Sequence, residues 1–226
     1  MGFLDSWYTR EPKQVIEKET PPNQGIVLFF EVLWREFWGL CELNLIFVVF
    51  CVPLITIPAA ITAMNKIMIF MLMDNPVDIF ADFFATFKAE WKRATIAGLM
   101  YFPLLALTIF GQYFYLTVMP NPLLYLVSML SCAVVIIAGF YLFAMIAVLD
   151  LSLQGALRNS LLLVFIRVPQ NVVTLLVVVL LALLVWMFFP ATLLILIVIF
   201  FAFVGFVCTF CAYTGLKDLV IKKELP

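Results

Sequence analysis

The chain has 226 residues, of which 66% are apolar and only 12% charged, with a formal net charge of −1 at pH 7. Soluble globular domains carry roughly a quarter charged residues, so this composition excludes a water-soluble protein built around one apolar core. The mean hydropathy of +1.17 predicts that lipid surrounds most of the chain. At this length, one integral membrane domain, residues 1–226, accounts for the whole sequence.

The polar N-terminal segment, residues 1–24, contains Arg10, Lys13 and Lys18 among several glutamates. It lacks the short apolar core and small-residue cleavage site of a signal peptide. We therefore expect this segment to be retained.

An amphipathic helix is predicted next, because Glu31, Arg35 and Glu42 recur at spacings of four and seven residues and so share one helix face. Its aromatic residues, such as Trp34 and Trp38, are typical of a membrane interface.

Two prolines, Pro53 and Pro58, interrupt the apolar stretch that follows, with Thr56 between them. Proline removes a backbone donor and clashes with the preceding helical turn, whereas it is favoured at a helix start, where threonine is a frequent N-cap. We predict a helix ending near Val52, a turn, and a second helix from Pro58 to about Met73, capped by Thr56. A re-entrant loop and one kinked span are the alternatives.

Four longer apolar runs are each predicted to cross the membrane, since they approach or exceed the roughly 20 residues needed to span about 30 Å of hydrocarbon. None of them contains Asp, Glu, Lys or Arg. Pro120 and Pro122 separate the first two runs, and Pro190 separates the last two. The runs are Ala94–Leu116, Leu123–Leu149, Thr174–Phe189 and Ala191–Tyr213.

The predicted fold class is therefore all-α: a polytopic helical membrane protein with four clear spans plus an N-terminal proline-broken hairpin, six helices in all, and amphipathic cytoplasmic helices. Its segments are residues 1–24 (polar), 26–73 (amphipathic helix and hairpin), 74–93 (cytoplasmic amphipathic helix), 94–149 (span pair), 150–171 (cytoplasmic loop), 172–214 (span pair) and 215–226 (cytoplasmic tail).

All thirteen Lys and Arg residues lie outside the four long runs, and the two shortest connections carry none. Basic residues concentrate on the cytoplasmic side of membrane proteins. A hairpin at residues 43–64 places all thirteen on that side, with both termini cytoplasmic in a bacterial plasma membrane. A single crossing there would give five spans and leave four basic residues outside.

A second amphipathic stretch precedes the first long run. Phe83, Phe87 and Trp91 fall at helical spacing beside Lys88, and the later loop carries Arg158 and Asn159. We expect these residues to dock another membrane subunit, because aromatic and Arg side chains anchor interfaces. Seating of the helix among lipid headgroups is the alternative. Nucleic acid is not an expected partner, since the helix leads directly into a span.

An ion pair between Glu42 and Lys66 is also predicted. Each lies about ten residues from the turn, so a hairpin brings both to a similar depth. A charge near lipid is stabilised by a partner.

The arrangement resembles the YesL-like family of bacterial multi-pass membrane proteins, a domain of unknown function. The hairpin motif carries the likeness through Asn44, Pro53, Thr56 and Pro58, although Ile57 stands where the family usually has Gly. Further matching stretches are Asp82–Lys88, Trp91–Arg93 and Ala156–Leu161. The resemblance implies a context of carbohydrate uptake, alongside a sugar importer permease of the ABC type or a sensor kinase.

Two functions follow. The chain contains no His and no phosphate-binding Gly-rich loop, so we expect no enzyme, no cofactor and no metal. We assign Cys208 and Cys211, spaced as CxxC, to apolar packing. The favoured function is an accessory subunit of a larger membrane complex. The alternative is an autonomous facilitator for a small neutral solute, using polar groups such as Asn44, Thr56, Asn65 and Gln112.

Overall fold

The computed structural model describes residues 25–149 and 151–224, without the side chains of 218–224, and all regular structure in these ranges is helical. The predicted all-α fold class is confirmed. The helices are α1 (Ile26–Arg35), α2 (Phe37–Phe50), α3 (Ile57–Leu72), α4 (Ile79–Tyr113), α5 (Pro122–Val148), α6 (Leu153–Ile166), α7 (Val168–Met187), α8 (Leu193–Ile195) and α9 (Phe201–Glu224), with a 3-10 turn η2 (Leu54–Thr56) and π-helical segments η3 (Phe114–Val118) and η4 (Leu196–Phe200).

Five helical stretches of the described chain are long and apolar enough to cross a membrane. Four of them overlap the four predicted runs, and the fifth comprises the 3-10 turn and α3. A polytopic membrane protein is therefore confirmed. The stretches are Leu54–Leu72, Ile79–Val118, Pro122–Val148, Val168–Met187 and Leu193–Lys217.

The proline-broken hairpin forms as predicted, since α2 ends at Phe50 and α3 begins at Ile57. The predicted capping role of Thr56 is wrong. Its side chain makes no capping bond to α3; its hydroxyl donates instead to the backbone carbonyls of Phe50 and Pro53. Thr56 thus closes the turn through its hydroxyl, in addition to the backbone bond from its N–H to the Pro53 carbonyl at 3.0 Å.

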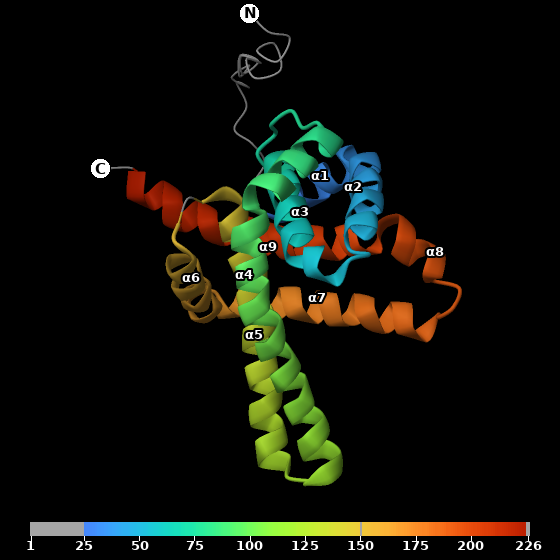
Figure 1. The fold of residues 1–226 in the computed structure, drawn as a ribbon, viewed down its shortest axis with the longest axis vertical. Helices are drawn as coiled ribbons and strands as arrows, with labels where there is room; N and C mark the ends of the chain where they lie inside the picture. The colour runs from blue at the N-terminus through green and yellow to red at the C-terminus, as the bar shows by residue number, and fades with distance from the viewer. Residues whose placement is uncertain (1–24, 150, 225–226) are drawn as a thin grey trace, which may run out of the picture.

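Helix α3 runs antiparallel to the charged half of α4. At one end, Pro58 packs so closely on Gly98 that a Cβ at position 98 would lie 2.3 Å from the proline Cγ. At the other end, Met71 and Ile79 meet at Gly39 of α2. The hairpin therefore lies beside residues 79–98, and its turn reaches only the start of the apolar half of α4 (Figure 1).

The amphipathic stretch runs into the first long apolar run without a break, because α4 is one helix of 35 residues. No helix-breaking residue lies at the Arg93–Ala94 boundary. The helix is firmly started: Asp78 accepts from Ala81 N at 3.1 Å, and its own N–H donates to Asp82 at 2.9 Å. This reciprocal cap fixes the start of the helix.

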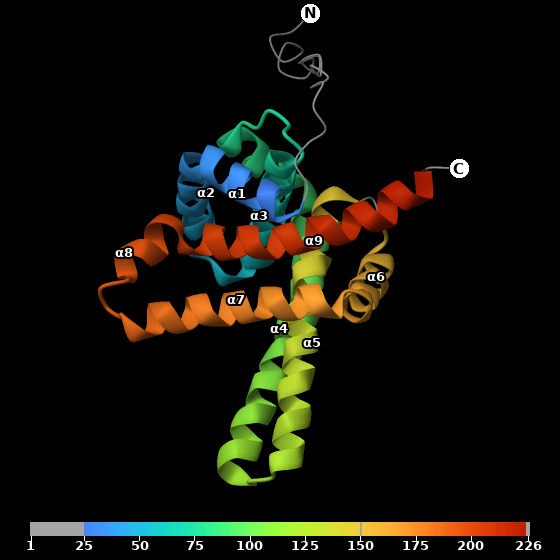
Figure 2. The same cartoon turned by 180° about the vertical axis from the view of Figure 1, so that it is seen from behind.

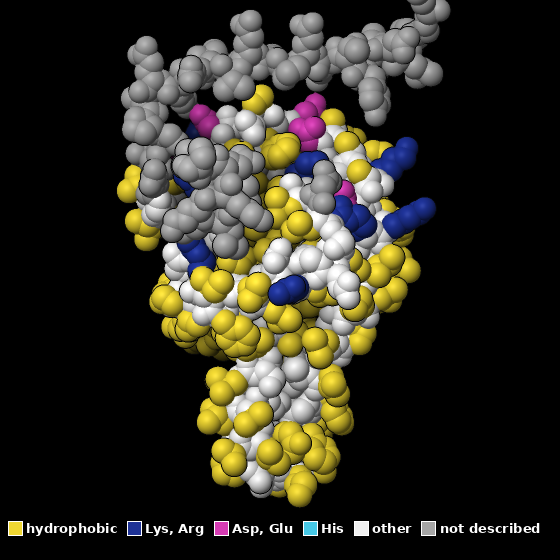
Figure 3. Space-filling view, turned by 90° about the vertical axis from the view of Figure 1, so that its left-hand side faces the viewer, with side chains coloured by type: hydrophobic (Ala, Val, Ile, Leu, Met, Phe, Trp, Pro, Cys, Tyr) yellow, Lys and Arg dark blue, Asp and Glu magenta, His cyan; other side chains and the backbone are white. Residues whose placement is uncertain are grey.

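The distal parts of α4 and α5 project from the rest of the molecule as a helical pair, while α7 and α9 lie across that pair (Figures 1 and 2). Charged side chains gather over the opposite end, and the projecting pair shows none on the face seen in Figure 3. The partition of charge along the sequence is thus also a partition in space.

Helix α9 connects two apolar cores. Near its start, Phe206 packs with Met68 of α3 and Leu43 of α2. Further along, Ala212 packs with Tyr141 of α5 and Leu163 of α6. Since α9 belongs to both cores, the hairpin and the α5–α6 unit form one packed body.

We predict that Gly98→Ala destabilises the protein by about 1–3 kcal/mol, the usual effect of overpacking a tight core contact. The added methyl group would overlap the Pro58 ring. The thermal unfolding midpoint of the purified protein in detergent measures this effect. Pro58→Ala should partly restore the stability of the Gly98→Ala protein, because it removes the clashing ring. A Gly98→Ala protein that is as stable as one carrying Ile96→Ala, on the exposed face, would contradict the contact.

Candidate functional site

Asn44, predicted as part of the hairpin motif, lies away from the turn. Its side chain is hydrogen-bonded to the backbone of the last apolar run, at residues 196–202. Its amide donates to the carbonyl of Ile197 at 2.6 Å and to that of Leu196 at 3.4 Å. Its Oδ1 accepts from Ala202 N at 2.7 Å. These groups lie where the π-helical segment η4 passes into α9. π-helical turns interrupt regular α-helical bonding, and the fully buried Asn44 side chain supplies partners at this point.

Two further buried polar groups join helices. Asn65 of α3 accepts from Thr209 of α9 at 2.6 Å, while its own amide donates to Ile61 O at 2.8 Å. Such interhelical bonds are the usual role of amides within membrane helices.

The second group is centred on Asn171 of α7. Its Oδ1 accepts from the Tyr141 hydroxyl at 2.6 Å, and its amide donates to the carbonyls of Leu163 and Val164 at 3.1 and 3.0 Å. The Cys211 Sγ lies 3.5 Å from both Tyr141 Oη and Asn171 Oδ1. Cys208 and Cys211 are both free and buried, so the CxxC pair lies in the helix packing.

Three of the four polar residues considered for a solute path therefore have structural partners. Asn44, Thr56 and Asn65 are all engaged with backbone or side chains inside the fold. Gln112 is half-buried on the projecting part of α4.

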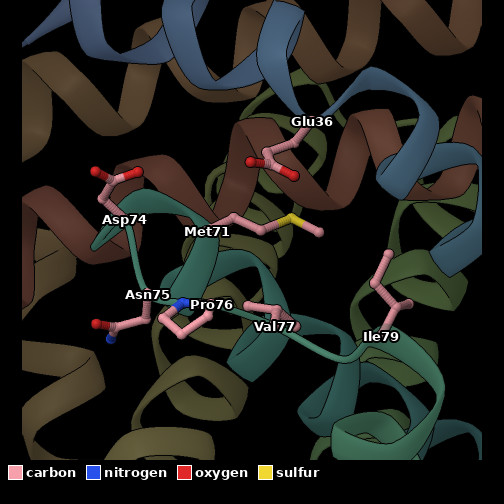
Figure 4. A pocket seen from close by; sticks show the side chains of 7 residues that line it. All are labelled: Glu36, Met71, Asp74, Asn75, Pro76, Val77 and Ile79. Atoms are coloured by element: carbon pink, nitrogen blue, oxygen red, sulfur yellow. The ribbon is translucent and has the colours of Figure 1, made fainter. Parts of the chain in front are cut away.

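A polar hollow of about 310 Å³ lies at the open end of the hairpin (Figure 4). The carboxylates of Glu36 and Asp74 lie near Met71 at its rim. Arg35 binds both carboxylates: its Nε lies 2.9 Å from Glu36 and its Nη1 lies 2.9 Å from Asp74. Its Nη2 also donates to the Met71 carbonyl at 3.2 Å. Arg35 thus joins α1 to the C-terminal end of α3.

Asp74 occupies the left-handed position that ends α3, with φ of 57°. Asn75 N donates to Phe70 O at 3.0 Å and Asp74 N donates to Met71 O at 3.2 Å, which is the Schellman pattern. Glycine is the usual residue at this position, and Asp is one of the few others that tolerate it. Its carboxylate is what Arg35 binds.

The predicted ion pair between Glu42 and Lys66 does not occur among the ion pairs of the described residues, which join Arg35 to Glu36 and Asp74, and Arg93 to Glu90. Glu42 is exposed on α2. Lys66 Nζ lies 5.6 Å from the centroid of the Phe70 ring. A cation above an aromatic face is stabilised without a carboxylate partner.

The predicted docking residues on α4 divide by burial. Phe83 is fully buried and packs against Phe50 with ring centroids 5.3 Å apart, so its predicted contact with a partner is wrong. Phe87 and Trp91 are half-buried and pack on one another at 5.3 Å, whereas Lys88 is exposed. Helical spacing alone does not reveal that α2 covers Phe83.

An apolar hollow of about 490 Å³ adjoins these aromatic residues. It lies between the C-terminal end of α2, the proline turn and α4. The lining residues are Val49, Phe50, Pro53, Thr56, Phe87 and Trp91.

Arg93 connects α4 to the segment that carries the other predicted docking residues. Its guanidinium donates to the carbonyls of Leu149 and Leu151, which join α5 to α6, and pairs with Glu90 at 3.0 Å. On α6, Arg158 is exposed and Asn159 is half-buried. Ser152 caps this helix by accepting from Gly155 N at 3.1 Å, so α6 has a defined start close to Arg93.

We predict that Asn44→Leu destabilises the protein by about 1–3 kcal/mol for each backbone group left buried without a partner. The two groups are the Ile197 carbonyl and the Ala202 N–H. Amide hydrogen exchange over residues 196–204 should accelerate, and the thermal midpoint should fall. Gln112→Leu is the matched control, since no hydrogen bond of that amide occurs among the described residues. Equal behaviour of the two variants would disprove the role of Asn44.

Comparison with known families gave one match: residues 40–111 match the family described as "Protein of unknown function, DUF624". No curated protein and no solved structure gave a significant match. The matched stretch covers most of α2, all of α3 and nearly all of α4. The matched stretch contains Asn44 and the proline turn but not the stretch Ala156–Leu161 of α6, which also carried the predicted resemblance. Over the matched residues the predicted resemblance is confirmed, because the chain is similar there to the DUF624 family of unknown function.

Proposed function

We propose that this protein is a non-enzymatic accessory subunit of a larger membrane complex, associated with a bacterial carbohydrate-uptake system of the ABC importer type or with a sensing system. The carbohydrate context rests on the family resemblance. The subunit role rests chiefly on one observation: exposed Lys88 and Arg158 lie on two helices, α4 and α6, that Arg93 ties together.

A docking surface formed by Phe87, Lys88, Trp91, Arg158 and Asn159 has the chemistry of an interface anchor. Aromatic and Arg side chains bury a large area while keeping a polar handle. Attachment to backbone carbonyls at the α5–α6 junction holds the two helices in fixed register. The proposed partner is a sugar importer permease or a sensor kinase.

The buried Asn side chains are hydrogen-bonded to other helical segments, and this favours a subunit over a solute facilitator. A facilitator needs polar groups that face a continuous path, whereas Asn44 and Asn65 are bound to η4 and α9. An enzyme would need a nucleophile, base or metal ligand set. The apolar runs contain no ionisable Asp, Glu, Lys or Arg from which to build one.

We also propose that the protein lies in the plasma membrane with both termini cytoplasmic. The confinement of all thirteen basic residues outside the long apolar runs supports this orientation. So does the position of the hairpin beside the charged half of α4, because both ends of the hairpin then lie on the same side as Lys88.

Cysteine labelling should confirm this orientation. In a protein whose five native cysteines are replaced, Asp5→Cys and Glu224→Cys are expected to react only after the cells are opened. Both positions lie outside the part of the chain whose side chains the structure describes. Reaction of Asp5→Cys with an impermeant reagent on intact cells would refute the orientation and restore five crossings.

Charge reversal should weaken partner binding. We expect Lys88→Glu combined with Arg158→Glu to lower the yield of co-purified importer or kinase subunit about tenfold or more, as for interface anchors of about 1.4 kcal/mol or more. Lys66→Glu is the matched control, since Lys66 lies over Phe70 on α3. Undiminished co-purification would refute docking. Solute flux by the purified protein in liposomes would establish the facilitator instead.

A further inference from the structure

We propose that the apolar hollow beside the proline turn binds one acyl chain of an anionic membrane lipid, with Lys88 and Lys92 holding its headgroup. This inference concerns the chain alone in a bilayer. It gives Phe87, Lys88 and Trp91 a lipid ligand where the proposed function gives them a protein partner, and Arg158 tests the partner separately. The support for the lipid site is the chemistry of the hollow, its depth, and the charges at its edge.

The hollow suits a hydrocarbon chain and not a polar solute. Its walls are side chains of Val, Phe, Pro and Trp, and its single hydroxyl group belongs to Thr56. That hydroxyl already donates to the carbonyls of Phe50 and Pro53, so its donor is not available to a ligand. A volume of about 490 Å³ lies in the range of small-molecule sites. An acyl chain that fills the hollow gains van der Waals contacts with these walls, which is what drives association within a bilayer.

The depth of the hollow corresponds to the boundary between headgroups and hydrocarbon. On the turn, Val52, Leu54 and Ile55 are 78%, 79% and 61% exposed. Exposed side chains of this kind are stable in contact with lipid. On α4, the charged residues end at Arg93 and the apolar run begins at Ala94. Trp91, which lines the hollow, lies just before this boundary, where aromatic residues concentrate.

The charge at the edge of the hollow is positive. Lys88 follows Phe87 directly and lies one turn before Lys92, so both cations are on the flank of α4 next to the aromatic lining. Both are exposed, and the ion pairs of the described residues include neither of them. The nearby carboxylate of Glu90 is bound to Arg93. Two cations at headgroup depth attract an anionic lipid.

An apolar side chain of a partner protein would also fit the hollow. The lipid is favoured because the turn residues around the opening are themselves exposed and apolar, so the opening faces the medium that surrounds the turn. A zwitterionic lipid would satisfy the hollow but not the two lysines.

Trp91 provides a direct probe of the lipid. The chain has five Trp residues, and a full-length protein retaining only Trp91 can be reconstituted in phosphatidylcholine vesicles. Phosphatidylglycerol with brominated acyl chains should quench its fluorescence at a lower mole fraction than brominated phosphatidylcholine. We expect a difference of about fivefold or more for each lysine that holds the headgroup.

Lys88→Gln with Lys92→Gln should abolish this preference, whereas Arg158→Gln, an equivalent loss of charge on α6, should keep it. A protein retaining only Trp38, which is exposed on α2, should be quenched equally by both lipids. Equal quenching of Trp91 by both lipids would overturn the proposal, since Trp91 would then lie in bulk lipid. Absence of quenching, or a preference that survives the double Gln substitution, would overturn it as well.

The lipid test and the docking test have independent outcomes, so one proposal can be rejected while the other is retained. Arg158→Glu alone tests the partner surface without touching the hollow, and the quenching experiment uses purified protein with no partner present. Loss of co-purification with Arg158→Glu alongside unselective quenching would retain the accessory subunit and reject the lipid site.

Discussion

The contact between α3 and α4 determines the rest of the arrangement. Because Pro58 lies directly on Gly98, the hairpin turn cannot move along α4 without losing its closest packing. That contact sets how far the turn reaches, and therefore where Phe50 meets Phe83 and Phe87. It also leaves the apolar half of α4 to pair with α5, where Ser128 donates to the Thr108 carbonyl at 3.1 Å.

The two hairpin prolines stand at the ends of the helices that this contact positions. Pro53 ends one helix, and Pro58 lies in the first turn of the next, as proline chemistry requires. What the sequence does not reveal is the partner of each residue. The Thr56 hydroxyl can accept from the first N–H groups of α3 or donate to carbonyls of the turn, and in the structure it donates to the carbonyls. Local propensity predicts a turn but cannot rank such alternatives.

Apolar runs and prolines were sufficient to predict the spans and the hairpin, because both signals act locally and strongly. The pairing of distant side chains was not predictable in the same way. Asn44 and Ile197 are far apart in the sequence, and so are Arg35 and Asp74. The Glu42–Lys66 pairing assumed equal depth, whereas depth alone does not determine which faces of α2 and α3 meet. Phe83 was misassigned for the related reason that amphipathic spacing defines a face but not what covers it.

Helix α4 is continuous from Ile79 to Tyr113, so it behaves mechanically as a single rod about 50 Å long at 1.5 Å per residue. Its first half is held by α3 and by the Arg93 bonds, while its second half projects with α5. A small rotation of the anchored half about Gly98 would therefore displace the far tip by a larger distance than it displaces the anchored half. Pro103, just beyond Gly98, removes one backbone hydrogen bond from the rod. Bending of the helix would accordingly concentrate at Pro103, which changes the angle of the projecting pair without disturbing the packing around Gly98.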